Sequence, residues 1–341
     1  SPLRELLRKE KYSFYMAKTN NVTLDFISLG EALIDLISCE EAETLGDAAY
    51  YQRFAGGEPA NLARNMALLG NKVAMGTCVG DDGFGEYIRE QLASMQISTQ
   101  YVQITPRAPS TLALITRTAG GTPDFIICRG ADALLKPTQA LMEAVASCRL
   151  VHTSAFAISR NPARDTILQA FHTARDHDVL ISFDPNYHPS IWPDVQDFLS
   201  LLRDVYQHVT ITKPSLDDCA RIFSPGLDPA EYAQRFIQWG AEIVIITMGD
   251  QGVLLATAEG ERYRLFANPI SVKDVTGAGD AYWAGFLTAV LDDTSPLDAA
   301  RQGQALAEIK IGSVGPLTSA PDRAVLDDII QSIRYQKLPS E

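Results

Sequence analysis

The chain has 341 residues, 46% of them hydrophobic, and its 42 acidic and 29 basic residues give a formal net charge of −13 at neutral pH. This composition indicates a globular protein with a large core, and the acidic surface disfavours nucleic acid as a partner because it repels phosphate backbones. No segment approaches the roughly 20 consecutive apolar residues that span a bilayer, so we expect no membrane association.

The N-terminal extension and the cysteines say little about function. Residues 1–23 contain basic residues but no apolar signal core, and Leu3, Leu6 and Leu7 suggest a short helix there. The odd number and wide spacing of the cysteines favour neither a disulfide framework nor a zinc site, so we expect free thiols in the cytoplasm. The cysteines are Cys39, Cys78, Cys128, Cys148 and Cys219.

Short apolar runs that predict strands recur from residue 24 onward. The runs are Phe26–Leu29, Val73–Val79, Leu150–Thr153, Val179–Phe183, Val209–Thr212, Ile243–Thr247 and Val253–Ala256. Amphipathic segments that predict helices separate them, among them Asn61–Leu69, Phe84–Met95, Pro162–His177 and Pro229–Trp239. Most of the runs are apolar on both faces, which predicts an α/β fold with a doubly wound, mostly parallel sheet.

Two regions, 31–55 and 107–130, predict strands without intervening helices. In the second region the runs Thr111–Thr118 and Asp124–Arg129 flank the sequence Ala-Gly-Gly-Thr-Pro at 119–123, which is typical of a hairpin turn. We predict that the two regions form a small β-sheet lid beside the core. The core would then comprise residues 24–30, 56–106 and 131–336.

The segment Lys273–Phe286 contains the clearest chemical pattern. Gly277, Ala278 and Gly279 precede a predicted helix, and small residues there allow a phosphate to approach the free N–H groups of the helix N-terminus. Asp280 follows in the first turn, where it can accept a proton from an attacking hydroxyl, so the segment offers both parts that phosphoryl transfer needs. The alternative is a tight turn with Asp280 stabilising the helix start.

This segment resembles the signature of the ribokinase-like carbohydrate kinases, the PfkB family. The run Gly-Gly-Glu-Pro-Ala-Asn-Leu-Ala at 56–63 resembles the N-terminal signature of that family, and Glu31–Asp35 resembles its substrate-binding segment. The resemblance extends from about residue 24 to about residue 325. It implies a ribokinase-like fold with a β lid, a sugar substrate, and ATP with Mg²⁺.

The resemblance also implies a role for each matching residue. Asp280 would be the catalytic base, and the N–H groups of residues 277–279 would form the anion hole. The sugar hydroxyls would be bound by Asp35, Gly56, Gly57 and Asn61. Without the resemblance, these four residues are better interpreted as a solvated carboxylate, a plain turn and a helix cap.

Lys213–Asp218 aligns with a family segment that usually contains Asn-x-x-Glu. This chain has Ser215 and Asp218 at that spacing, and their oxygens can contact a hydrated Mg²⁺ ion or a phosphate. Lys213 would face the nucleotide phosphates. The alternative is a helix capped by Ser215, with acids in its first turn and a solvated Lys213 before it.

Two further segments match weaker family features. The Gly-x-x-Gly turn after a buried strand implies a nucleotide site formed by Thr247, Gly249 and Gly252, although a plain β-turn explains the same spacing. Asp274 and the loop 313–315 lie where many relatives bind a monovalent cation, so K⁺ is a further expected cofactor.

Arg129, Asp184 and Asn186 bear on which sugar is bound. Fructokinases and 2-keto-3-deoxygluconate kinases have similar residues, and Arg129 could cover the substrate or pair with a carboxylate, unless it is a surface arginine. Those kinases usually have Arg at the position of His188, and this departure weakens both assignments. Fructose is narrowly favoured; 2-keto-3-deoxygluconate, 5-dehydro-2-deoxygluconate and ribose stay open.

The sequence therefore predicts an ATP-dependent kinase that phosphorylates a primary hydroxyl of a sugar. A dinucleotide-dependent oxidoreductase is disfavoured because Gly80–Gly85 does not have the Gly-x-Gly-x-x-Gly spacing after the first strand. A non-catalytic sugar sensor on the same fold is the other class of function, and the intact Asp280 disfavours it. We also expect a homodimer formed through the lid sheet, whose open edges need a partner.

Overall fold

The computed structural model describes residues 23–118 and 124–339. The short helix predicted around Leu3–Leu7 and the hairpin turn predicted at 119–123 lie outside the described residues. Within the described ranges, no helix is both long enough and apolar enough to cross a bilayer.

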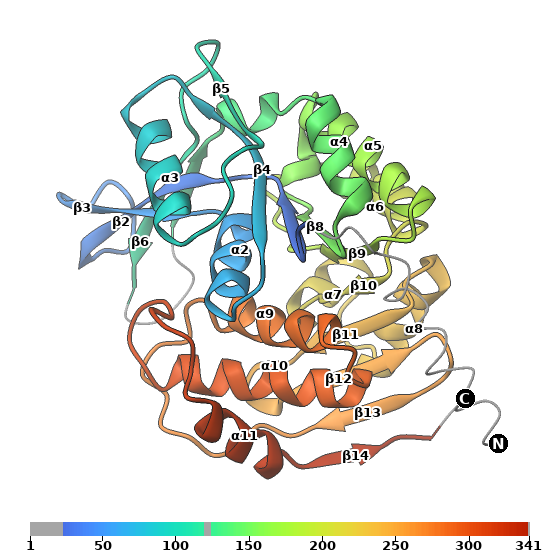
Figure 1. Ribbon diagram of the computed structural model, residues 1–341. Helices are drawn as coiled ribbons and strands as arrows, with labels where there is room; N and C mark the ends of the chain where they lie inside the picture. Colours follow the sequence, from blue (N-terminus) through green and yellow to red (C-terminus); the bar gives the residue numbers. More distant parts are fainter. Residues whose placement is uncertain (1–22, 119–123, 340–341) are drawn as a thin grey trace.

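A ten-stranded sheet forms the centre of the fold (Figure 1). Its strands lie in the order β14 (Tyr335–Lys337), β13 (Arg262–Leu265), β12 (Val253–Thr257), β11 (Ile243–Thr247), β10 (Ile211–Thr212), β9 (Leu180–Asp184), β8 (Leu150–Ser154), β1 (Phe26–Leu29), β4 (Val73–Gly80) and β5 (Val102–Thr105). From β5 to β11 all neighbours are parallel, and β12 to β14 are antiparallel. The central strands β1, β4, β8 and β9 are buried along their whole length, as expected for a covered parallel sheet.

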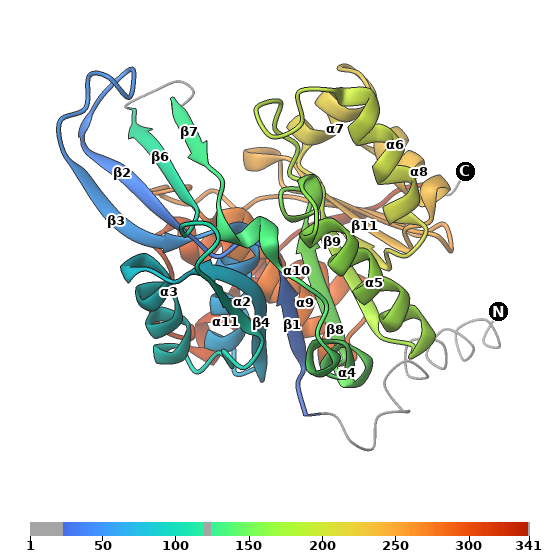
Figure 2. The ribbon, with the colours of Figure 1, turned by 90° about the horizontal axis from the view of Figure 1, so that it is seen from above.

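Helices cover both faces of this sheet (Figure 2). One layer contains α2 (Glu58–Leu68), α3 (Gly83–Ser94), α9 (Ala278–Leu291), α10 (Pro296–Ile311) and α11 (Arg323–Ser332). The other contains α4 (Gln139–Ser147), α5 (Ala163–Asp176), α6 (Val195–Tyr206), α7 (Leu216–Ile222) and α8 (Pro229–Trp239). Two large apolar clusters, one on each face, fill the space between sheet and helices. The doubly wound α/β fold predicted from the sequence is confirmed.

A separate four-stranded sheet stands beside the core (Figure 2). Its order is β3 (Tyr51–Gly56), β2 (Leu33–Glu41), β6 (Leu112–Arg117) and β7 (Phe125–Cys128). The pairs β2–β3 and β6–β7 are antiparallel, whereas β2 and β6 run parallel. The two strand-rich regions of the sequence therefore meet in one sheet, and the β2–β6 pair joins them.

Two local features differ from the sequence-based expectations. The helix predicted at Asn61–Leu69 begins earlier, at Glu58, because Pro59 is favourable in a first helical turn and Gly57, at φ 100°, supplies the backbone conformation before it. The strand β12 pairs antiparallel with β11, because only residues 248–252 separate the two and a parallel pair would require a long crossover.

Candidate active site

The N-terminus of α9 lies at the carboxyl ends of the central parallel strands. Gly277 precedes the helix in the left-handed conformation, at φ 77°, which a residue with a side chain adopts only under strain. Gly279 is exposed, and a Cβ atom built on it would lie 3.8 Å from Lys213 Nζ. The N–H group of Ala278 donates to Val275 O at 3.1 Å, so of the three predicted amides this one already has a partner.

Asp280 lies in the first turn of α9 and is half-buried. Burial, together with the nearby charge of Glu58, raises the pKa of Asp280 to about 7, although Lys213 acts in the opposite direction. A carboxylate with a pKa near neutrality is suited to accept a proton at neutral pH. This raised pKa is an electrostatic signature expected of a general base beside the predicted anion cradle.

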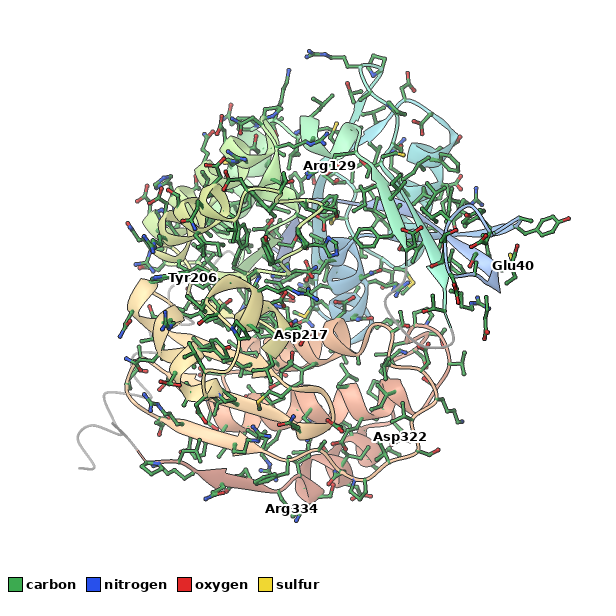
Figure 3. All side chains as sticks on the ribbon, turned by 180° about the vertical axis from the view of Figure 1, so that it is seen from behind. Glu40, Arg129, Tyr206, Asp217, Asp322 and Arg334 are labelled. Carbon is green, nitrogen blue, oxygen red and sulfur yellow. The ribbon has the colours of Figure 1, made fainter. Side chains whose placement is uncertain are left out.

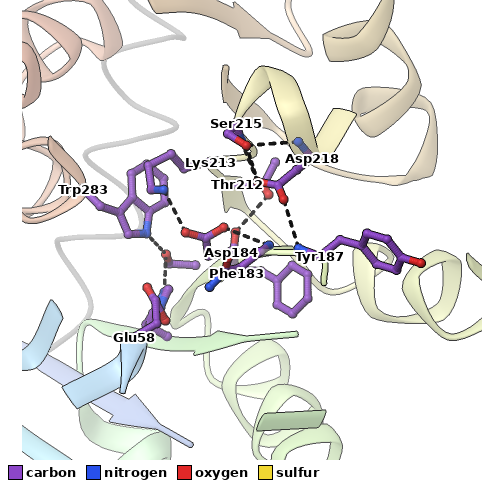
Figure 4. Close-up of polar contacts among 12 residues, drawn as sticks. Glu58, Phe183, Asp184, Tyr187, Thr212, Lys213, Ser215, Asp218 and Trp283 are labelled. Atoms are coloured by element: carbon purple, nitrogen blue, oxygen red, sulfur yellow. Dashed lines mark hydrogen bonds and ion pairs between the residues drawn. The ribbon is translucent and has the colours of Figure 1, made fainter. Parts of the chain in front are cut away.

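A buried ion pair lies beside this position (Figure 4). Lys213 Nζ lies 2.8 Å from Asp184 Oδ2, and both side chains are less than a tenth exposed. Asp184 ends β9 and Lys213 follows β10, so two adjacent parallel strands bring the pair together. The interpretation of Lys213 as a solvated lysine is therefore wrong. Burial alone would lower the pKa of Lys213, but the charge of Asp184 raises it, so the ammonium group stays charged.

A second group of polar contacts leads from Glu58 into the core, and the sequence did not predict it. His152, fully buried, lies 3.1 Å from Glu58 through Nε2 and 2.8 Å from Ser182 Oγ through Nδ1. Trp283 Nε1 donates to the same hydroxyl at 3.0 Å. Burial lowers the pKa of His152 to about 3, so its ring is neutral, and burial with the charge of Asp184 raises the pKa of Glu58. The only signal for Glu58 in the sequence was its place between the motif glycines and Asn61.

The residues predicted to bind sugar meet where β2, β3 and α2 join. Asp35 on β2 is half-buried, and burial raises its pKa to about 6. A Cβ on Gly56 would overlap the Asp35 carboxylate, and one on Gly57 would lie 2.5 Å from Glu31 O, so this turn requires glycine at both positions. Asn61 begins the second turn of α2, where its N–H group donates to Gly57 O at 2.8 Å.

Asn61 and Gly56 line a cavity of about 280 Å³ that also contains Arg64, a residue that the sequence did not single out. Arg64 Nε is buried and has no hydrogen-bond partner among the described residues. Burial lowers the pKa of Arg64, although the charge of Asp280 partly opposes this effect. The cavity therefore contains an unsatisfied cationic donor near the predicted base.

Arg129 lies where β7 leaves the small sheet, and Figure 3 labels it there. Its side chain is 3% exposed, so the surface-arginine alternative is wrong. Its Nε atom pairs with Asp132 at 2.7 Å, Nη1 donates to Phe156 O at 2.8 Å and to Ser159 Oγ, and Nη2 donates to Ala157 O at 3.4 Å. Most of its donors are thus used by the chain itself.

Asn186 is exposed, at φ 28°, and its N–H group donates to Asp184 Oδ1.

Ser215 and Asp218 form a capping box at the start of α7 (Figure 4). Asp218 Oδ2 accepts from the Ser215 N–H group at 3.0 Å and from its hydroxyl at 2.6 Å, and Oδ1 accepts from the Tyr187 N–H group at 3.0 Å. Burial, then the charge of Asp184, raises the pKa of Asp218. The helix-cap interpretation thus accounts for Oδ2, and the Tyr187 N–H group after β9 occupies Oδ1.

The predicted nucleotide residues line a larger cavity. Thr247, Gly249 and Gly252 border a space of about 790 Å³ that reaches Ala278 and Gly279 at the anion cradle. This volume is that of a typical small-molecule site and suits a nucleotide. No group of three or more His, Cys, Asp or Glu side chains in the described part of the chain could hold a metal ion, so Mg²⁺ fits here chiefly through water and nucleotide phosphates.

Asp274, the expected ligand of a monovalent cation, contacts a buried lysine instead. Lys310 Nζ lies 2.8 Å from Asp274 O and 3.2 Å from Oδ2, and its side chain is 1% exposed. Burial alone would raise the pKa of Asp274, but hydrogen bonds from Thr276, Gly315 and Lys310 lower it to about 2. The loop 313–315 does approach Asp274, because the Gly315 N–H group donates to Oδ2 at 2.9 Å.

Comparisons with known proteins show what the whole chain is similar to. The sequence relatives include the ATP-dependent 6-phosphofructokinase of Thermoanaerobacterium thermosaccharolyticum, 32% identical over 87% of this chain and 91% of that protein. The 5-dehydro-2-deoxygluconokinase of Geobacillus kaustophilus is 28% identical over 91% and 95% of the two chains. A probable fructokinase, number 4, of Arabidopsis thaliana is 27% identical over 83% and 87%.

The solved structures with similar folds include the fructokinase of Halothermothrix orenii, with a TM-score of 0.73 and 34% identity over 83% of this chain and 98% of that one. A fructokinase of Vibrio cholerae, described with fructose, ADP and a potassium ion, has a TM-score of 0.76 at 22% identity over 89% and 97%.

The family profile described as pfkB family carbohydrate kinase matches residues 24–323. That span includes both strand-rich regions of the small sheet, the glycine turn at α2 and the whole of α9. Together with the fold and the relatives, it shows that the chain belongs to the pfkB family of carbohydrate kinases and is an ATP-dependent sugar kinase.

Proposed function

We propose that this sugar kinase transfers the γ-phosphoryl group of ATP to a primary hydroxyl of fructose. The observation that supports the chemistry is the position of Asp280, a half-buried carboxylate with a pKa of about 7 at the N-terminus of α9. The nucleotide-sized cavity reaches Ala278 and Gly279, just before this residue, and Asn61 and Arg64 on α2 line a second cavity. ATP, with Mg²⁺, is the proposed phosphoryl donor.

In the proposed reaction Asp35 and Asn61 hold the sugar hydroxyls, and Asp280 accepts the proton of the attacking hydroxyl. The N–H groups of Gly277 and Gly279 donate to the oxygens of the transferring phosphoryl group. Lys213, which Asp184 keeps charged, adds a fixed positive charge close to Gly279. Mg²⁺ bound with the nucleotide would neutralise phosphate charge.

Two observations support a neutral sugar such as fructose. The probable fructokinase of Arabidopsis thaliana and the fructokinase of Halothermothrix orenii are both similar to this chain along most of its length. Arg129, the arginine predicted to pair with a substrate carboxylate, already pairs with Asp132. This arrangement makes 2-keto-3-deoxygluconate and 5-dehydro-2-deoxygluconate weaker candidates. The relative from Geobacillus kaustophilus, however, is named as a kinase of the second compound. Ribose remains a further alternative.

Arg64 favours a second candidate, an acceptor that already has a phosphate group. Its buried Nε atom has no partner among the described residues, and a phosphate entering the cavity at Asn61 would provide one. The 6-phosphofructokinase relative is named for such an acceptor. Arg64→Met should then weaken the use of fructose 6-phosphate while leaving that of fructose unchanged, and Arg89→Met, an exposed arginine on α3, is the matched control.

The deciding experiment measures ADP release from Mg-ATP with fructose, fructose 6-phosphate, ribose, 2-keto-3-deoxygluconate and 5-dehydro-2-deoxygluconate. Fructose should exceed the others by about tenfold or more in kcat/KM, and a larger response to another acceptor would replace it. A sugar that raises the melting temperature without any ADP release would instead support the sugar-sensor alternative. Asp280→Asn serves as the inactive reference.

The four-stranded sheet would act as the lid of the site and as the contact of a homodimer. Its outer strands β3 and β7 each have one free edge within the described sheet, and Tyr50 and Ile126 are exposed beside or on them. A sheet with open edges and apolar exposure is stabilised by a partner. Lid closure would exclude water from the reacting phosphate and so limit ATP hydrolysis.

A further inference from the structure

The loop that leads into α9 is attached to the end of α10 by a buried charge. Lys310 lies in the last turn of α10, and its side chain is 1% exposed. Its ammonium group donates to the main-chain oxygen of Asp274 at 2.8 Å and lies 3.2 Å from the Oδ2 atom of the same residue. One lysine thus contacts both a carbonyl and a carboxylate oxygen, the two ligand types that a hard cation prefers.

Both side-chain oxygens of Asp274 also accept main-chain hydrogen bonds. Its Oδ1 atom accepts from the Thr276 N–H group at 2.9 Å, and Oδ2 accepts from the Gly315 N–H group at 2.9 Å as well as from Lys310. A potassium ion at these oxygens would either have to displace the buried ammonium group or have to share one carboxylate with it. Two positive charges at one such site repel each other, so the residues present do not fit the monovalent cation expected here.

We propose that Lys310 replaces that cation, so that its ammonium group orders the anion-hole loop and the kinase works without potassium. This proposal rests on the family's kinase activity and on the proposed role of residues 277–279, not on the identity of the sugar. The proposal goes beyond the expected cofactors. It assigns the ammonium group of Lys310 to the position at Asp274 where a monovalent cation was expected from the resemblance.

The contacts around Lys310 explain how it would order the loop. A Cβ built on Gly277 would lie 4.0 Å from Lys310 Cε, so the lysine stem passes directly behind the left-handed residue that precedes α9. The N–H group of Lys273 donates to Ile311 O at 2.8 Å, and the Ser313 hydroxyl donates to Lys310 O at 2.9 Å. The start of the loop, the lysine and the segment after α10 therefore form one unit behind the phosphate-facing amides.

A covalently attached ammonium group differs from a bound ion in one measurable way. A bound ion dissociates when it is removed from the buffer, so an enzyme that uses one depends on salt identity as well as on ionic strength. Lys310 cannot dissociate. Removing the ammonium group would leave the main-chain oxygen of Asp274 without this donor, and the carboxylate with only the Thr276 and Gly315 N–H groups.

The first test compares wild-type protein in potassium, sodium and choline chloride at equal ionic strength. ADP release with the best acceptor and the melting temperature should both be the same in the three salts. A potassium-specific rise of about tenfold in kcat/KM, or a potassium-specific rise in melting temperature, would overturn the proposal. The melting measurement needs no acceptor, so it remains decisive even if every sugar in the panel is inactive.

The second test uses Lys310→Met, which removes the ammonium group and retains an apolar stem. Its affinity for Mg-ADP, measured by calorimetry, should fall in choline chloride and recover at least in part in potassium chloride, together with the melting temperature. Lys72→Met, at an exposed lysine before β4, should behave like wild type in every salt. A Lys310→Met protein that binds Mg-ADP as wild type does in all three salts would refute the role of the lysine; if the variant does not fold, the wild-type salt comparison decides alone.

Discussion

At the scale of single residues, Asp280 is held in an environment that disfavours its charged form. Burial and Glu58 raise its pKa to about 7, and the base is active only when deprotonated, so kcat/KM should rise with pH through that value. Asp280→Asn should lower kcat by roughly 10²–10⁴-fold and remove this limb of the profile. A variant that retains wild-type turnover would show that another group accepts the proton.

The same substitution should change stability in a pH-dependent way. Because the pKa of Asp280 in the folded protein is raised, the wild type loses stability as pH rises through about 7, whereas asparagine has no proton to lose. The melting temperature of Asp280→Asn relative to wild type should therefore be higher at about pH 8 than at about pH 5.5. An equal difference at both values would contradict the raised pKa.

Glu58 offers a separate test, because its charge is one cause of the high pKa of Asp280. Glu58→Gln keeps an acceptor for His152 and removes the repulsion, so the acid limb of kcat/KM should move to lower pH. Glu90→Gln, at an exposed glutamate on α3, should leave the limb where it is. An unmoved limb in the first variant would mean that burial alone raises the pKa of Asp280.

The sequence was informative about residues that act through position in a motif and uninformative about those that act through tertiary contacts. Asp280 and the glycines before it could be proposed from the helix start together with the resemblance to the family signature. Glu58, His152 and Lys310 could not, because burial and partners from distant segments determine their chemistry. Lys310 did have one signal in the sequence. It is a basic residue between two isoleucines, near the end of a helix that consists mostly of small and apolar residues.

At the scale of elements, α7 tests whether Asp218 is structural or binds metal. Asp218 accepts three hydrogen bonds at the helix start, so Asp218→Ala should lower the free energy of unfolding by about 1–3 kcal/mol, measured in urea. Asp217→Ala removes a neighbouring exposed carboxylate from the same turn and should cost much less. If Asp218→Ala instead keeps its stability and needs more Mg²⁺ for activity, the metal role is the correct one.

Elements that form because of their own sequence pattern were predicted more accurately than elements that form because of pairing with distant segments. The strand Ile243–Thr247 and the helix Pro229–Trp239 match the predicted bounds, because each has a clear apolar pattern and, for the helix, an Asp228 capping box with Pro229 in the first turn. The edge strands β5 and β14, and β13 beside β14, were missed. Tyr335–Lys337 is short and exposed, and only its pairing with β13 makes it a strand.

At the scale of the whole molecule, the site is assembled from both sheets and from both ends of the described chain. In the proposed site, β2 and α2 would contribute the sugar side, β9 and β10 the ion pair, and α9 with α10 the anion cradle and the charge behind it. Of these elements, α2, α9 and α10 lie in one helix layer of the core, whereas β2 belongs to the small sheet. Movement of the small sheet relative to the core would therefore change the sugar side through β2 without disturbing the anion cradle. This arrangement is the physical basis for expecting lid closure on sugar binding.

The small sheet also determines the expected oligomeric state. On β7, Ile126 and Cys128 are exposed while Phe125 and Ile127, which alternate with them, are half-buried, so one face of the strand is left apolar and open. Wild-type protein should be a dimer by light scattering, and Ile126→Lys should shift it to monomer because a charge at that face resists burial. Val325→Lys, at a half-exposed valine on α11, should remain dimeric, whereas a dimeric Ile126→Lys protein would exclude this face as the contact.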